Sequence, residues 1–296
     1  MSPARILSLT VLAMAAFAGN SLLCRLALKN TAIDPASFTA LRLASGALVL
    51  WLVGRAQSRG ASARSGAGNW LSALALFAYA AGFSFAYVSL PAGTGALLLF
   101  GAVQATMIGH GLARGERFRP PQLAGLGLAF VGIVGLLLPG LSAPPLAGAL
   151  LMIGAGAAWG VYSLRGRGAG DPTRVTAGNF LRAAPLALVL SLFMLKSASL
   201  DAAGTWLAIA SGALTSGIGY AVWYGVLPAL KATTAATVQL SVPVLAALGG
   251  VAFLGEPVTL RLALASGAIL GGIALVVLQK RPPPPPAGAA LKSPGD

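Results

Sequence analysis

The sequence predicts an all-α integral membrane protein with ten transmembrane helices, arranged as two five-helix inverted repeats with both termini cytoplasmic. Three observations lead to this fold class. Hydrophobic residues make up 57% of the 296 residues and charged residues only 9%, against about 25% charged in an ordinary soluble domain. The apolar residues form ten runs of spanning length, and the two halves of the chain repeat each other. A water-soluble globule is therefore excluded.

Each apolar run has about the 20 residues that a helix needs to cross the hydrocarbon core. The runs are residues 6–27, 36–54, 69–89, 91–113, 121–138, 145–164, 175–195, 203–226, 232–254 and 261–279. Residues 120–164 carry no charge and are interrupted only by Pro139-Gly140 and Pro144-Pro145. This pattern indicates two helices joined by a turn, because the strands of a membrane barrel would show alternating segments of about ten residues.

The two ends of the chain need separate interpretation. Residues 1–19, with Arg5 and the triplet Ala16-Phe17-Ala18, also fit a signal peptide. A first membrane helix is preferred, because the apolar stretch up to Cys24 is long enough to span and completes the internal repeat. Residues 281–296 contain five consecutive prolines followed by small residues and are predicted to be disordered.

The basic residues predict the orientation. Fourteen of the 20 Lys and Arg lie at the N-terminus, in the loops after even-numbered helices or in the tail. The opposite side holds only Arg25, Lys29, Lys196 and Arg261, and two more arginines lie within helices. Because basic residues are retained on the cytoplasmic side, both termini are predicted to be cytoplasmic.

The remaining composition excludes several classes. The net charge of +14 raises nucleic-acid binding, but the basic residues form no basic helix or aromatic-interleaved patch, so no nucleic-acid partner is expected. Cys24 is the only cysteine, which excludes an intrachain disulfide and a cysteine-based metal site. With one histidine and six scattered acids, we expect no metal site, no cofactor and no enzymatic activity.

A shift of 140 positions aligns the chain with itself. It pairs Arg42 with Arg182 and places Gly115-Glu116 on Gly255-Glu256, with several further glycines in register. We predict a first unit at 1–138, a second unit at 139–280 and the tail at 281–296. Because each unit has five helices, the second enters the membrane in the opposite orientation, which is the architecture of alternating access.

These residues resemble the EamA-type members of the drug/metabolite transporter superfamily. The resemblance is carried by Trp159-Gly160, by the two arginines, and by Gly115-Glu116 and Gly255-Glu256-Pro257. It implies export of small metabolites through a central cavity lined by the first four helices of each unit, with helices 5 and 10 peripheral. Within the superfamily, the chain also resembles the aromatic amino acid exporter branch. Phe17-Ala18-Gly19 departs from the Trp-Gly pattern of such families, which affects the substrate rather than the fold.

Polar and aromatic residues within the helices are the candidate substrate-cavity residues, since buried polar groups need partners. They are Asn20, Tyr79, Phe83, Gln104, Trp159, Ser163, Tyr220, Gln239 and Ser241. The alternative for the aromatic members is packing or an interfacial belt. Gly101, Gly109 and Pro243 are candidate gating or kink positions, with tight helix packing as the alternative.

The charged residues in or near the helices are expected to be structural. Arg42 lies about 10 Å along its helix, close enough to the surface for its side chain to reach headgroups. Because Arg182 is placed symmetrically, the two arginines are expected to share a structural role, in contact with lipid or with backbone. A contact with a substrate carboxylate is the alternative. Glu116 and Glu256 lie near Arg117, Arg119 and Arg261, so each is expected to form a loop salt bridge or a turn contact rather than to act in catalysis.

Energy coupling and cargo follow from the same residues. No carboxylate is predicted deep in the membrane, and His110, near the end of the fourth helix, is the one residue that comes near a titrating role. We therefore expect a facilitative exporter of amino acids, aromatic or neutral, in a bacterial inner membrane. The alternatives are an exporter of drugs or lipophilic cations, a membrane-embedded enzyme and a non-transporting scaffold. The expected partners are a small-molecule substrate and the lipid bilayer; the chain is expected to be a monomer, with a dimer through helices 5 and 10 as the alternative.

Overall fold

The computed structural model describes residues 1–57, 68–115, 119–140, 142–166, 171–230 and 232–278, and in this part of the chain all regular structure is helical. Seven helices cover the first two thirds: α1 (Pro3–Asn30), α2 (Pro35–Gln57), α3 (Trp70–Tyr87), α4 (Ala92–Ala113), α5 (Pro120–Leu137), α6 (Leu146–Gly166) and α7 (Pro172–Phe193). They are followed by η1 (Leu195–Ser197), α8 (Ala202–Ala210), η2 (Ser211–Ile218), α9 (Gly219–Val226), η3 (Leu227–Ala229), α10 (Ala232–Gln239), α11 (Ser241–Leu254) and α12 (Leu260–Leu278).

These elements form ten spans that are long and apolar enough to cross a membrane. The segments α8 to η3 together form the eighth span, and α10 with α11 forms the ninth. Every predicted span is present, with ends that lie within three residues of the predicted ones. In its described residues the chain is therefore a multi-pass membrane protein with ten spanning segments, as the sequence predicts. The proline-rich tail and Glu116 lie outside the described residues.

Polar side chains set the starts of several helices. Asp34 accepts hydrogen bonds at 2.9 Å from the amides of Ala36 and Ser37 at the start of α2, and Asp171 does the same for Thr173 in α7. Asp34 also accepts from the amide of Ser199 at 3.0 Å, which ties the loop before α2 to the loop before α8. Burial raises the pKa of the Asp34 carboxyl, but the hydrogen bonds from Ser37, Ser199 and Ala36 outweigh it and hold this pKa below its ordinary value.

Two spans depart from a regular α-helix. The eighth contains η2, a π-helical stretch of eight residues, which the sequence did not predict. The ninth is interrupted at Leu240, between α10 and α11. Pro243 explains this break, because it has no N–H to donate to the carbonyl of Gln239 and its ring crowds that carbonyl.

The two halves of the chain interlock rather than forming separate bundles. α2 packs against α7, α4 against α11 and α5 against α12, so equivalent helices of the two halves meet. α1 packs against the eighth and ninth spans, while α6 packs against α3 and α4. The contact pattern is therefore symmetric: it stays the same when each of the first five spans is interchanged with its equivalent among the second five, as expected for two repeated units. The domain boundaries themselves stay a prediction.

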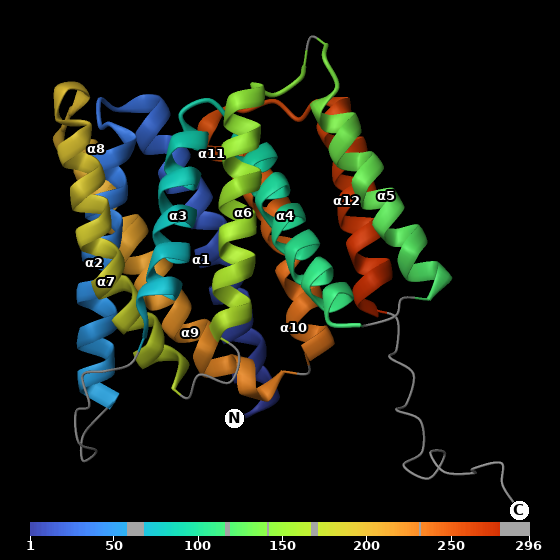
Figure 1. Ribbon diagram of the computed structural model, residues 1–296, viewed down its shortest axis with the longest axis horizontal. Coiled ribbons are helices and arrows are strands. Elements are labelled where there is room, and N and C mark those ends of the chain that lie inside the picture. Colours follow the sequence, from blue (N-terminus) through green and yellow to red (C-terminus); the bar gives the residue numbers. More distant parts are fainter. Residues whose placement is uncertain (58–67, 116–118, 141, 167–170, 231, 279–296) are drawn as a thin grey trace, which may run out of the picture.

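α5 and α12 form a peripheral pair at one edge of the molecule, on the right in Figure 1. Glycines allow their close approach. A Cβ at Gly125 would lie 2.6 Å from the carbonyl oxygen of Gly272, and a Cβ at Gly272 would clash with the carbonyl oxygen of Gly125. A Cβ on Gly267 or Gly271 would meet no atom within 4 Å. The outer face of α12 is therefore open.

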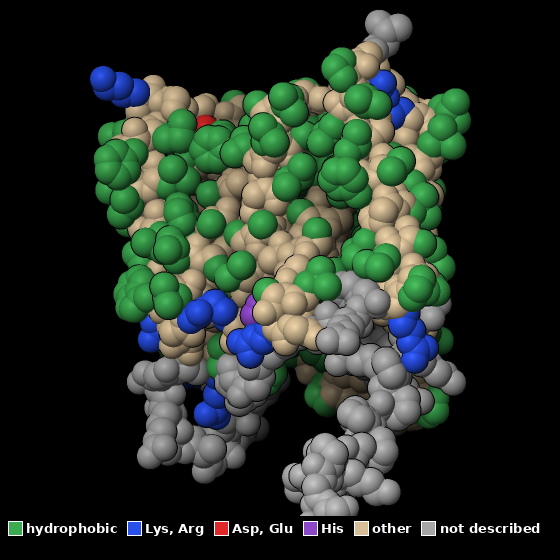
Figure 2. All heavy atoms as spheres, turned by 45° about the vertical axis from the view of Figure 1, so that its right-hand side comes forward, with side chains coloured by type: hydrophobic (Ala, Val, Ile, Leu, Met, Phe, Trp, Pro, Cys, Tyr) green, Lys and Arg blue, Asp and Glu red, His purple; other side chains and the backbone are tan. Residues whose placement is uncertain are grey.

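The surface has the division expected of a membrane protein. Figure 2 shows a broad band of apolar side chains, with Lys and Arg gathered mainly below it and a few at the upper corners. Leu74, Phe130 and Leu192 are among the large hydrophobic side chains that are more than half exposed. α1 begins at the lower edge in Figure 1, so the more basic side is that of the N-terminus.

Candidate functional site

A cavity of about 490 Å³ lies between the two halves of the chain. Side chains from α1, α3, α4, α6, α7, the eighth span and α10 line it, and none from α5 or α12. α2 contributes no lining residue, whereas the resemblance implies that the first four helices of each unit line the cavity. The cavity extends to Gly166, Pro172 and Leu227, where α6 ends, α7 begins and the eighth span ends. It therefore reaches toward the side of the N-terminus (Figure 1).

Eight of the nine sequence-predicted cavity residues line this space: Asn20, Tyr79, Phe83, Gln104, Trp159, Ser163, Tyr220 and Gln239. Their role in substrate binding stays a prediction. Ser241 does not line the cavity. It lies beyond the break at Leu240, at the start of α11. Its hydroxyl donates instead to the carbonyl of Val238, at 2.6 Å.

Aromatic rings from both halves form one wall of the cavity. Trp159 is central: its ring lies 4.8 Å from that of Tyr79 and 5.3 Å from that of Tyr220, the latter at an interplanar angle of 27°. Phe17 meets Tyr220 edge-on at 5.6 Å, so the altered Phe17-Ala18-Gly19 position keeps an aromatic side chain in the cavity. Such a wall can stack a planar ring or hold an apolar side chain.

Polar groups cluster at the inner end of the cavity. The Asn20 amide donates to the Tyr79 hydroxyl at 3.4 Å and its oxygen accepts from Ser211 at 2.7 Å. Thr215, one turn further along η2, lies 3.2 Å from the same oxygen. Ser211 was not among the predicted cavity residues, although a serine within an apolar span is the same kind of signal as the other polar residues that were predicted. The π-helical stretch brings Ser211 and Thr215 to Asn20.

A second polar group, Asn179 of α7, also lines the cavity and was missed from the sequence. Its side-chain nitrogen donates to the Tyr162 hydroxyl at 3.4 Å, and its side-chain oxygen accepts from the backbone N–H of Asn69 at 2.9 Å. Arg165 donates to Asn69 and Ser72 at 3.1 Å, which ties the end of α6 to the start of α3. A lone asparagine in an apolar helix was the available signal.

The expectation that Arg42 reaches the lipid headgroups is wrong. The side chain is 1% exposed and turns inward from α2, where it donates to the Tyr79 hydroxyl at 2.9 Å and to Ser216 at 3.3 Å. Its guanidinium lies over the rings of Tyr79 and Phe83, 5.2 and 4.8 Å from their centroids. Arg182 is half-buried and donates to Gly178 of its own helix, so the two arginines do not share one role.

The salt bridge of Glu256 is also not the expected one. Its partner is Arg25, which lies within α1 rather than in a loop, with Nε 3.0 Å from Oε1. The other carboxylate oxygen accepts from the amide of Ala92 at 2.7 Å, and Arg25 also donates to the carbonyls of Tyr87 and Val88. Arg261 instead donates to the carbonyl of Leu138. This buried network joins α1, the α3–α4 turn and the end of α11.

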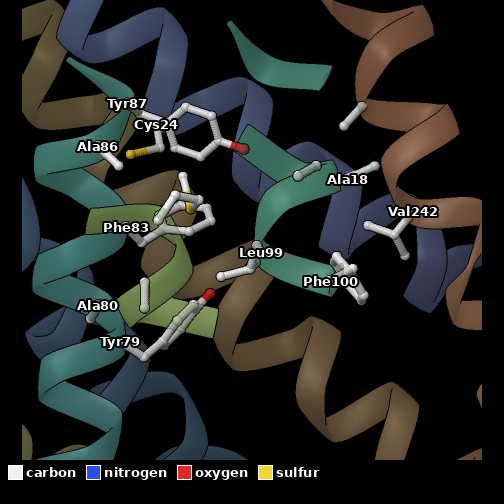
Figure 3. Close-up of a cluster of buried hydrophobic side chains, with 14 of the residues drawn as sticks. Ala18, Cys24, Tyr79, Ala80, Phe83, Ala86, Tyr87, Leu99, Phe100 and Val242 are labelled. Carbon is white, nitrogen blue, oxygen red and sulfur yellow. The ribbon is translucent and has the colours of Figure 1, made fainter. Parts of the chain in front are cut away.

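The network lies beyond the inner end of the cavity, on the side opposite its opening. Between the two, Cys24, Phe83 and Tyr87 pack together, as Figure 3 shows, and each is at most 1% exposed. The edge-to-face contact of Phe83 and Tyr87 has a centroid separation of 4.7 Å. The cavity is therefore closed toward the side where α1 ends and α4 begins.

The remaining candidates lie apart from this centre. Gly101 is buried, and a Cβ there would meet only Ile133 and Ile269 at ordinary contact distance, whereas one at Gly109 would meet nothing within 4 Å. His110 is exposed at the end of α4 and does not line the cavity. Among the described residues, no group of three or more His, Cys, Asp or Glu is placed to hold a metal ion.

Comparison with known sequences gives three findings. Residues 146–278 match the EamA-like transporter family. The chain is 60% identical over 289 residues to the uncharacterized protein PA1977 of Pseudomonas aeruginosa, which covers 98% of this chain and 100% of that protein. It is also 32% identical over 164 residues to the threonine/homoserine exporter RhtA of Escherichia coli, which is 51% of this chain and 53% of RhtA.

A solved crystal structure has the same fold. At 22% sequence identity it superimposes with a TM-score of 0.66, covering 94% of this chain and 98% of that chain. The likeness thus extends over both halves of the chain, whereas the segment matched to the family lies in the second.

Proposed function

This chain belongs to the EamA-like transporter family, within the drug/metabolite transporter superfamily, and we propose that it exports neutral amino acids, with aromatic ones preferred. The family and the similarity to RhtA support a small-molecule exporter. The observation that carries the amino acid proposal is a cavity with an aromatic wall and a polar inner end, built from both halves of the chain. A bacterial inner membrane is the proposed location.

The size and lining of the cavity fit a cargo of this kind. A volume of about 490 Å³ lies within the range of small-molecule sites, which are mostly apolar with a few polar groups that orient the ligand. The stack of Tyr79, Trp159 and Tyr220 suits a ring or an apolar side chain, while Asn20, Gln104 and Gln239 suit the backbone groups of an amino acid.

The alternative cargo, a lipophilic cation, fits this site less well. No acidic side chain is among the residues that line the described cavity, so a cation would lack a counter-charge there. The charge nearest to the inner end is itself positive, since Arg42 donates to Tyr79. Aromatic faces attract cations, but the arginine already occupies those of Tyr79 and Phe83.

We propose alternating access as the mechanism, with the described conformation facing the cytoplasm. The cavity reaches the basic side of the molecule, and the Arg25–Glu256 network with the Cys24, Phe83 and Tyr87 layer closes the other. To open the cavity to the opposite side of the membrane, this network would have to break while the cavity mouth near Gly166 closes. Neither a carboxylate nor a histidine lines the described cavity, which supports facilitated rather than proton-coupled export.

Efflux from proteoliposomes tests the proposal. We would load them with labelled phenylalanine, threonine or tetraphenylphosphonium and measure efflux with and without a pH gradient. Saturable phenylalanine efflux that Trp159→Ala reduces and Trp70→Ala does not is the expected result, because Trp70 is exposed at the start of α3, away from the cavity. Efflux of the cation alone would contradict the cargo, and stimulation by the pH gradient would contradict facilitation.

A further inference from the structure

The charge of Arg42 has no counter-ion among the described residues. The ion pairs there are Arg25 with Glu256 and Arg174 with Asp171, and neither involves Arg42. Its Nη1 is buried and has no hydrogen-bond partner in the described part of the chain. A buried cation without an anion is strongly unfavourable. Moving the charged guanidinium out of water costs more free energy than its interactions with neutral hydroxyls and ring faces provide. The geometry therefore leaves a place for an anion.

The hydrogen bonds at Tyr79 and Asn20 point to where that anion binds. Ser211 donates to the Asn20 oxygen, which turns the amide nitrogen toward Tyr79. The Tyr79 oxygen accepts from both Asn20 and Arg42, so its own hydrogen is left without an acceptor in the described structure. Asn20 likewise has a second N–H to offer. Both residues line the cavity, and both present unused donors to it.

Arg42 strengthens these donors from behind. It does not line the cavity, but its Nη2 lies 2.9 Å from the Tyr79 oxygen. A hydroxyl that accepts a hydrogen bond from a cation is polarised and becomes a better donor, and the low dielectric of the interior increases the effect. The positive charge also attracts an anion across the short distance that the phenol bridges.

We propose that the inner end of the cavity is a carboxylate-binding subsite in which Tyr79 and Asn20 donate to the ligand and Arg42 supplies the charge. This rests on the proposed function, because it assigns one chemical group of the cargo in the same cavity. One cation matches one monovalent carboxylate. The ring of Trp159, 4.8 Å from that of Tyr79, then receives the apolar part of the same molecule.

The site is present once, although the fold repeats. The repeat-related Arg182 donates to the carbonyl of Gly178 on its own helix, and the residues at the positions of Asn20 and Tyr79 in the second unit are Gly160 and Gly219. The cargo is thus bound in one orientation, with its carboxylate toward the closed side. Arg182 provides a matched control, since it is the same residue type at the equivalent position of the fold.

Two ligands that share a ring but differ in charge test the subsite. We would measure binding of 3-phenylpropionate and 2-phenylethylamine to the purified full chain in detergent, from the concentration dependence of thermal stabilisation. The wild type should bind the carboxylate at least about tenfold more tightly than the amine. Equal affinities, or tighter binding of the amine, would overturn the proposal without any variant.

Substitutions then identify the residues. Arg42→Met should weaken 3-phenylpropionate binding about 10- to 100-fold and Tyr79→Phe about tenfold, with little effect on neutral 3-phenylpropanol. Arg182→Met should leave all three ligands unchanged. If Arg42→Met does not fold, Tyr79→Phe decides, because it keeps the arginine and the ring and removes only the hydroxyl that donates to the ligand. Unchanged carboxylate binding in a folded Tyr79→Phe variant would overturn the assignment.

The subsite and the transport proposal can fail independently. Carboxylate binding that depends on Arg42, without amino acid flux, would support the subsite and refute the cargo. Amino acid flux with no preference for the carboxylate ligand would support the cargo and refute the subsite.

Discussion

Replacing Glu256 by Gln tests whether the buried network holds one side of the protein closed. The change keeps the shape of the side chain and an oxygen for the amide of Ala92, but it removes the negative charge opposite Arg25. The two side chains are only 7% and 10% exposed, so water screens their interaction little. Arg25 would keep the carbonyls of Tyr87 and Val88 as acceptors.

The expected cost follows from these contacts. Removing one partner of a buried ion pair typically destabilises the state that contains it by about 3–5 kcal/mol. Because the introduced amide retains hydrogen-bonding groups and Arg25 retains two carbonyls, we take about 3 kcal/mol for the closed state, at the lower end of this range. If the pair is broken when this side opens, the open fraction should rise about 100-fold.

Cys24 provides the readout, since it is the only cysteine, lies next to Arg25 in α1 and is 0% exposed. A membrane-impermeant maleimide added on the side opposite the N-terminus should label wild-type Cys24 slowly and the Glu256→Gln variant about 100-fold faster. Asp171→Asn serves as a matched control, because its pair with Arg174 is partly exposed to solvent and contributes little.

An unchanged labelling rate in a Glu256→Gln protein of normal thermal stability would refute the reasoning, since the pair would then not distinguish the closed state from the open one. Equal acceleration in Asp171→Asn would refute it as well, because it would indicate general loosening. The double variant Glu256→Gln with Arg25→Met should lose less stability than the sum of the losses in the two single variants, because it leaves no unpaired buried charge.

Further predictions concern the cavity, the peripheral helices and the loops. Trp159→Ala should weaken phenylalanine binding about 2- to 10-fold, measured at equilibrium, and threonine binding less, because it removes the centre of the aromatic stack. Gly272→Ala should lower the unfolding midpoint in scanning fluorimetry, since its Cβ would clash with the Gly125 carbonyl oxygen, whereas Gly271→Ala should not, since its Cβ meets nothing within 4 Å. Asp34→Asn should destabilise the protein at pH 7. Because the pKa of Asp34 is held below 3.8, its stabilising contribution is present above that value and is lost as the pH falls through the lowered pKa, so the difference from wild type should disappear in acid.

Much of the fold was predictable because it depends on local properties of the chain. A run of about 20 apolar residues has few alternatives to a spanning helix, so ten spans and their approximate ends follow from hydropathy. The break before α11 likewise follows from Pro243. The pairing of the peripheral α5 and α12 agrees with their low polarity, since residues 123–138 carry no polar side chain and residues 262–278 carry only Ser266. Eight cavity residues were found for a related reason, since polar and large aromatic groups inside apolar spans need a protein environment.

The sequence did not determine which groups meet. Arg25 and Glu256 are 231 positions apart, and the sequence offered the nearer Arg261 as partner. Arg42 and Arg182 occupy equivalent positions, yet one turns inward to Tyr79 and the other bonds its own helix. A residue's depth in the membrane can be counted along a helix, but the direction in which it faces depends on how that helix is rotated against its neighbours. Only the packed structure fixes this rotation, because it results from many weak contacts between distant segments.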